Sequence, residues 1–138
     1  MPAETIATYA FTKLVVDDLD AMCDYYCSVF GLHPGKRERF DDGVGGEPID
    51  EVALVANPGD PFGAVSLLCF EQRDPAAASR DEVILGFTTP DLSALVDRLT
   101  KAGGELVSPI KEMPSHEIRV AFARDPEGHL CELVELTG

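Results

Sequence analysis

The chain repeats part of its own sequence at a spacing of 73 residues. Identical residues recur at that one spacing (91 − 18 = 73), in the pairs Asp18/Asp91, Leu19/Leu92, Ala21/Ala94, Asp24/Asp97 and Gly31/Gly104. The spacing is about half of the 138-residue length, and a fixed spacing of this size indicates one duplicated supersecondary unit. We therefore expect the same order of helices and strands to occur twice.

The first half predicts a strand, a helix and three further strands. Residues 8–16 are β-branched and aromatic, and Asp17 or Asp18 can cap a helix whose apolar stripe ends at Gly31. Turns rich in glycine, proline and aspartate then separate three predicted strands, at 33–40, 50–55 and 64–71.

The second half predicts the same order. A strand at 82–89 leads into a helix at 91–102, and three strands follow, at 105–109, 118–123 and 130–136. We therefore predict an α+β fold, in which one domain, 1–138, holds two βαβββ modules in tandem at about 8–72 and 81–137.

Composition narrows the classes of partner. No apolar run approaches the roughly 20 residues that cross a bilayer, and residues 1–8 lack the layout of a signal peptide, so we expect a cytoplasmic protein without a membrane partner. Twenty-five acidic against eleven basic side chains give a net charge of −14, which repels nucleic acid. The four cysteines lie in apolar patterns typical of buried thiols rather than of a disulfide framework.

Two stretches carry a resemblance to a known family. The strand-to-helix step VVDDLDAMCDYYCSVFGL and the final hairpin DPEGHLCELVEL are similar to those of the vicinal oxygen chelate superfamily, which includes glyoxalase I, bleomycin-resistance proteins and extradiol dioxygenases. The resemblance covers nearly the whole chain and implies paired βαβββ modules whose curved mixed sheets form a cleft.

The resemblance also implies where a divalent metal would bind, on the first and last strands of each module. The matching positions hold Phe11, Leu67, Ile84 and Glu132, of which only Glu132 is a metal-binding carboxylate. Sliding the fifth strand by two residues brings Glu82 onto the same face. Because a divalent ion normally takes three or four protein donors, we favour no cofactor, and if a metal binds we expect Glu132 and Glu82 among its ligands.

Glu132 is the first candidate for a catalytic group. On its strand it shares one side with Leu130 and Val134, so it is either a general base in an apolar cleft or an inherited acid without a role. His116 lies in a segment that could overhang the cleft and is the second candidate, whereas His33 and His129 are expected to be structural.

Further residues are expected to line the ligand site. Arginine suits carboxylate capture, although the side of the strand on which Arg119 lies is not fixed by the sequence. The set of predicted ligand-binding residues is Phe11, Lys13, Leu67, Ile84, Arg119, Leu130 and Val134.

Three functions remain open at this point. One is a glyoxalase-like enzyme of lyase, isomerase or dioxygenase type that acts on a small oxygenated metabolite with a degenerate metal site. Another is a metal-free protein that sequesters a small organic molecule, as bleomycin-resistance proteins do, although the absence of Trp and the presence of only three Tyr disfavour a stacked flat ligand. The last is an interaction module without a ligand. In each case we expect a homodimer, because each module leaves one sheet face to cover.

Overall fold

The computed structural model describes residues 11–44, 46–60, 63–72 and 83–138. The chain divides into two compact units, which are treated separately below. The first unit consists of Met1–Cys23 and Leu32–Arg73, and the second consists of Asp24–Gly31 and Asp74–Gly138. The second half of the first helix thus belongs to the second unit.

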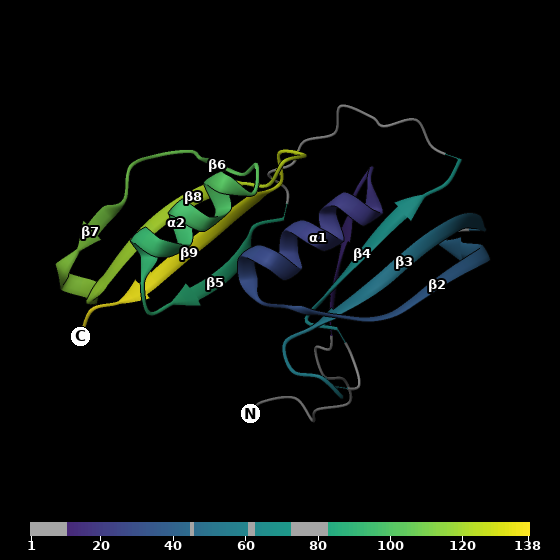
Figure 1. Ribbon diagram of the computed structural model, residues 1–138, viewed down its shortest axis with the longest axis horizontal. Coiled ribbons are helices and arrows are strands. Elements are labelled where there is room, and N and C mark those ends of the chain that lie inside the picture. The colour runs from purple at the N-terminus through teal and green to yellow at the C-terminus, as the bar shows by residue number, and fades with distance from the viewer. Residues whose placement is uncertain (1–10, 45, 61–62, 73–82) are drawn as a thin grey trace, which may run out of the picture. The chain divides into compact units, whose positions relative to one another are not determined.

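The first unit contains a four-stranded sheet in the order β1-β4-β3-β2 (Figure 1). Strands β1 and β4 are parallel and the other pairs are antiparallel. The strands are β1 (Thr12–Val15), β2 (His33–Val44), β3 (Glu47–Val55) and β4 (Val65–Phe70), and helix α1 (Leu19–Phe30) follows β1.

The strand register separates the two faces of this sheet. Leu14, Leu67 and Val52 lie side by side on one face, and each is at most 5% exposed. The start of α1 is tied to this same face, because Arg37, the partner of Val52 in β2, binds Asp20 of the helix. We call it the helical face and the opposite one, which carries Lys13, Ser66 and Ala53 in register, the non-helical face.

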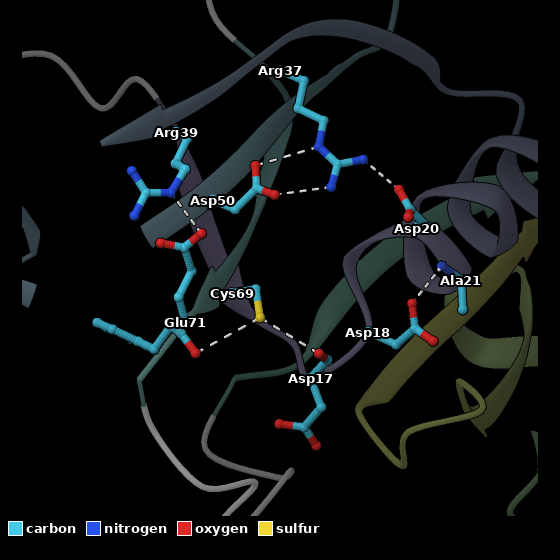
Figure 2. Close-up of polar contacts among 10 residues, drawn as sticks. Asp17, Asp18, Asp20, Ala21, Arg37, Arg39, Asp50, Cys69 and Glu71 are labelled. Carbon is cyan, nitrogen blue, oxygen red and sulfur yellow. Dashed lines mark hydrogen bonds and ion pairs between the residues drawn. The ribbon is translucent and has the colours of Figure 1, made fainter. Parts of the chain in front are cut away.

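Polar contacts hold the start of α1 against the sheet (Figure 2). Asp18 caps the helix, since its Oδ1 accepts a hydrogen bond from Ala21 N at 3.0 Å. Arg37 donates two hydrogen bonds to Asp50, at 3.3 and 2.9 Å, besides its contact with Asp20. Cys69 Sγ lies 3.4 Å from the carbonyl oxygen of Asp17. The arginine therefore serves the fold rather than a ligand.

The second unit contains a sheet in the order β5-β9-β8-β6, with β7 paired to β8 (Figure 1). Strands β5 and β9 are parallel, which matches β1 and β4 in the first unit. The elements are β5 (Leu85–Thr89), α2 (Leu92–Lys101), β6 (Glu105–Leu106), β7 (Lys111–Met113), a 3₁₀ turn (Pro114–His116), β8 (Ile118–Arg124) and β9 (Leu130–Leu136).

Helices cover one face of the second sheet as well. Phe87 of β5 stacks on Phe30 of α1 with ring centroids 3.8 Å apart, and the backbone amide of Leu92, at the start of α2, donates to Glu135 of β9 at 2.8 Å. Cys131 and Leu133 share this helical face and are at most 4% exposed. The predicted repeat of β-α-β-β-β is thus confirmed, and strand β7 is the element that the sequence did not predict. No helix in the described ranges is long and apolar enough to cross a membrane.

Candidate functional site

Glu132 lies at the centre of the non-helical face of the second sheet. It pairs with Gly86 of β5 on one side and with Phe122 of β8 on the other. Its side chain is half-buried and forms no hydrogen bond or ion pair with any residue that the structure describes. A carboxylate held among apolar neighbours without a partner retains its full capacity to accept a proton or a hydrogen bond from a ligand.

The space beside Glu132 is free on the β5 side. A side chain built on Gly86 would meet no atom within 4 Å, and the backbone there does not need glycine. Glycine inside a strand often marks a place where another group approaches closely. Ile84, two residues earlier, is 50% exposed, and Leu130 and Val134 share the face of Glu132 by strand alternation.

Glu135, on the opposite face of this sheet, differs from Glu132 because both of its carboxylate oxygens have partners. Its Oε1 accepts from Leu92 N at 2.8 Å and its Oε2 is 3.1 Å from Arg119 Nη1. The backbone hydrogen bond from Leu92, followed by the hydrogen bond from Arg119, lowers the pKa of Glu135. Arg119 also binds Glu112 at 2.9 Å, so it belongs to a cluster on the helical face. The structure thus places Arg119 on the face opposite Glu132, and its role in binding a ligand stays a prediction.

His116 is not brought to Glu132. It ends the 3₁₀ turn, is exposed, and its Nδ1 lies 3.2 Å from Ser115 Oγ. The nearest strand residue, Ile118, pairs with Leu136, four positions beyond Glu132. At a rise of about 3.3 Å per residue that row is roughly 13 Å away from the carboxylate. The structure therefore gives no support to a shared catalytic role for His116 and Glu132.

The two parallel strand pairs reveal which positions of the two modules correspond. Gly86 pairs with Glu132 in the second sheet, and Lys13, which precedes Gly86 by the same 73 residues (86 − 13 = 73), pairs with Ser66 in the first. The counterpart of Glu132 is thus Ser66. Leu67, which the sequence placed there, is 0% exposed and lies on the helical face. Ser66, one position earlier, is the residue that shares the face of Lys13, and a ligand-binding role for Leu67 stays a prediction.

These positions do not fit a divalent metal. The first-strand positions hold Phe11 and Ile84, which cannot coordinate, and the last-strand positions hold the hydroxyl of Ser66 and the carboxylate of Glu132. Among the described residues no group of three or more His, Cys, Asp or Glu side chains could hold an ion. Glu82 lies outside the described residues. No step of the proposed chemistry is therefore assigned to a metal.

The non-helical face of the first sheet holds a hollow of about 230 Å³. Lys13 reaches across β4 to Glu51 of β3, with Nζ and Oε2 2.8 Å apart, and its ammonium lies 5.7 Å from the ring centroid of Phe11. The sequence predicted Lys13 as a ligand-binding residue but not the rest of the lining, and Phe11, which was also predicted, is not among the lining residues. The residues that line the hollow are Lys13, Phe40, Asp42, Gly43, Ile49 and Glu51.

A buried polar network fixes the start of β9, the strand that carries Glu132. Asp125 Oδ2 accepts from Tyr26 Oη at 2.8 Å and lies 2.7 Å from His129 Nδ1, while Oδ1 accepts from the amides of Glu127 and His129. Burial raises the pKa of Asp125, but the hydrogen bonds and charge of His129 and the hydroxyl of Tyr26 outweigh it and hold that pKa below its ordinary value. His129 therefore has the structural setting that the sequence indicated.

Comparisons with known proteins agree with this architecture. Residues 6–133 match the family model described as the Glyoxalase/Bleomycin resistance protein/Dioxygenase superfamily. A search of curated protein sequences finds no match to the chain. Among solved structures, a glyoxalase family protein from Bacillus cereus is 24% identical with a TM-score of 0.83, and the match covers 100% of this chain and 99% of that one.

Two other structures extend the comparison. The fosfomycin resistance protein FosX from Listeria monocytogenes is 15% identical with a TM-score of 0.64, over 95% of this chain and 94% of that one. A V278E mutant of glyoxalase I from Zea mays is 18% identical with a TM-score of 0.71, over 93% of this chain and 46% of the maize protein. At these identities the likeness shows the fold and does not transfer an activity.

Proposed function

Since this chain belongs to the Glyoxalase/Bleomycin resistance protein/Dioxygenase superfamily, we propose that it is a glyoxalase-like enzyme that moves a proton on a small oxygenated metabolite. Glu132 is the general base of this proposal. Its carboxylate would accept a proton from a carbon beside a carbonyl or hydroxyl group, or from a hydroxyl group, and return it in a later step. The reaction type is thus of the lyase or isomerase kind.

The observation that carries this proposal is the isolation of Glu132. Glu135, Asp50 and Glu51 are bound to arginine or lysine, whereas the half-buried Glu132 has no such partner in the described part of the chain. An ion pair would stabilise the carboxylate and weaken it as a base. The free space over Gly86 gives a substrate a path to Glu132.

The surrounding residues have supporting roles. Phe122 and Gly86 flank the acid in register, and Leu130 and Val134 share its face, so a bound metabolite would meet apolar side chains around one polar anchor. In such a site the apolar side chains contact the metabolite, and the single polar group determines its orientation. Ile84, at the edge of this area, would contact the ligand without reacting.

The test uses Glu132→Gln, with Glu105→Gln as the matched control. Glu105 lies on the edge strand β6 of the same sheet, is exposed, and loses the same charge. Ligands come from a panel of small oxo- and hydroxy-acids that raise the Tm of the parent. For those ligands we expect Glu132→Gln to keep affinity within about twofold and to lower turnover by roughly 10²–10⁴. Turnover equal to that of the parent would remove the catalytic assignment.

A second candidate function is metal-free sequestration of a small organic molecule. The hollow of the first unit favours it, because that hollow combines an ion pair with apolar lining residues and lies apart from Glu132 in the sequence. Tight binding of a ligand that is recovered unchanged after prolonged incubation would select this function over the enzyme.

We also propose that the protein is a cytoplasmic homodimer. A net charge of −14 per chain means that two copies repel, so the shared surface must be mainly apolar. Static light scattering at micromolar concentration should give twice the chain mass of 14.9 kDa, and a monomer would contradict the proposal.

A further inference from the structure

The hollow on the non-helical face of the first unit combines three features. It opens beside the ion pair of Lys13 and Glu51, it is lined by Asp42, whose carboxylate has no partner among the described residues, and it has apolar lining residues. Its volume of about 230 Å³ corresponds to roughly eight waters at 30 Å³ each. That space is below the range of drug-sized pockets and suits a ligand of metabolite size.

The charges of the hollow are arranged as a pair with one acid in excess. Lys13 and Glu51 satisfy each other at 2.8 Å. Asp42, at the tip of the β2–β3 hairpin, makes no hydrogen bond or ion pair with any described residue. The lining therefore offers one acceptor for an ammonium group at Asp42. It also offers donor capacity at Lys13, whose ammonium has three N–H groups.

Asp42 lines this hollow from an irregular part of the hairpin. The β2–β3 ladder is irregular between Phe40 and Val44, where a bulge interrupts the register. Bulges re-aim side chains and are frequent beside functional sites. A Cβ built on Gly43 would lie 2.4 Å from Ile49 Cγ1, so any other residue at position 43 would push the hairpin tip away from the hollow.

The apolar lining residues determine the rest of the ligand. Phe40 is 38% exposed, and Ile49, its partner on the neighbouring strand, is 3% exposed. A benzyl or branched aliphatic group would cover Phe40 and gain hydrophobic contact. A ligand without net charge also avoids the repulsion that the charge of −14 imposes on anions.

We infer that this hollow binds a small zwitterion with an apolar side chain, of the α-amino acid class. Its ammonium group binds Asp42, its carboxylate accepts from Lys13, and its side chain packs on Phe40. The Lys13–Glu51 ion pair stays closed and orients the lysine. This inference goes beyond the proposed function, because it concerns the first unit and does not involve Glu132.

The experiment measures binding of L-phenylalanine by saturation-transfer NMR and by titration calorimetry. Two analogues each lack one charge: N-acetyl-L-phenylalanine has no ammonium group, and L-phenylalaninamide has no carboxylate. We expect L-phenylalanine to bind in the millimolar range and each analogue to bind about tenfold more weakly, because each loses one charge-assisted hydrogen bond.

Residue changes must match the ligand changes. Asp42→Asn should weaken the binding of L-phenylalanine about tenfold and leave the binding of N-acetyl-L-phenylalanine unaffected. Lys13→Met should weaken the binding of L-phenylalanine about tenfold and leave the binding of L-phenylalaninamide unaffected. Asp41→Asn is the control. It removes the same charge from the neighbouring residue, whose carboxylate pairs with Arg39. Both changed residues are on the surface, and circular dichroism verifies folding.

The outcomes are distinct. Binding that both site variants weaken selectively, and that Asp41→Asn and Glu132→Gln leave unchanged, supports the amino acid site regardless of whether Glu132 is catalytic. Absence of L-phenylalanine binding by the parent, or equal binding of the N-acetylated analogue, overturns the proposal. If Asp41→Asn weakened binding as much as Asp42→Asn, the effect of Asp42 would be one of general charge. That result would also overturn the proposal.

Discussion

Replacement of Asp125 by alanine should be among the most destabilising single changes in the second unit. Asp125 is 4% exposed, and it accepts hydrogen bonds from buried Tyr26 and from two amides of the turn while it contacts the ring of His129. The change leaves the hydroxyl of Tyr26 and Nδ1 of His129 buried without this partner. An unpaired buried polar group costs roughly 1–3 kcal/mol, so we expect a loss of about 3–5 kcal/mol in the free energy of unfolding.

The assay is urea unfolding followed by circular dichroism, with the slope of the free energy against urea concentration held constant between variants. Asp91→Ala is the matched control. Asp91 caps α2 by accepting from Ala94 N at 3.0 Å, but it is exposed. Loss of such a cap costs about 1 kcal/mol. Equal losses for the two variants would refute the reasoning, since burial of the partners would then contribute nothing.

Acid titration tests the same network through the charge of Asp125. The pKa of this carboxyl is depressed in the folded chain below its ordinary value of 3.8. A depressed pKa means that the ionised group stabilises the fold above about pH 4 and that this contribution is lost as the pH falls through the folded value. The stability difference between the parent and Asp125→Ala should therefore be constant near neutral pH and shrink below about pH 4.

Four further predictions rest on burial and donor chemistry. Tyr25→Phe should raise the free energy of unfolding by up to about 1 kcal/mol, because the buried Tyr25 hydroxyl has no hydrogen-bond partner within the described ranges. Gly104→Ala should cost roughly 1–3 kcal/mol, part of which Tyr25→Phe restores, since the added Cβ would lie 2.6 Å from that hydroxyl. Leu67→Ala should cost about 2–5 kcal/mol and Ile84→Ala about 0.5 kcal/mol, and equal costs in urea unfolding would contradict the register given above. Elemental analysis after purification without chelators should find well under one divalent ion per chain, and a stoichiometric ion held through Glu132 would show that donors outside those considered complete a site.

The order of elements was predictable because hydrophobic alternation and turn residues are local signals. The repeat at 73 residues related the first strand and helix of one module to those of the other, and both helices begin and end within a residue or two of the predicted positions. Strand β7 escaped prediction because it has three residues and no apolar alternation.

The facing of side chains was less predictable, for physical reasons that differ between strands. Strand β4 reads VSLLCF, and its first four residues are all buried, so no alternation shows which of Leu67 and Ser66 shares the face of Lys13. In β8 the small residues Ala121 and Ala123 lie on the helical face with Arg119. The size of the side chains alone would have placed the larger residues of β8 on that face. The pairing of Lys13 with Glu51 joins residues 38 positions apart and has no local signal.

The catalytic role of Glu132 remains a prediction, and isotope exchange tests it most directly. Proton NMR in D₂O follows the carbon-bound hydrogens of each acid in the oxo- and hydroxy-acid panel, with the parent protein, with Glu132→Gln and with Glu105→Gln. We expect the parent and Glu105→Gln to exchange the hydrogen beside the carbonyl or hydroxyl group of at least one acid, and Glu132→Gln to exchange it roughly 10²–10⁴ times more slowly. Exchange by Glu132→Gln at the rate of the parent, or no exchange of any acid by the parent, would contradict the account.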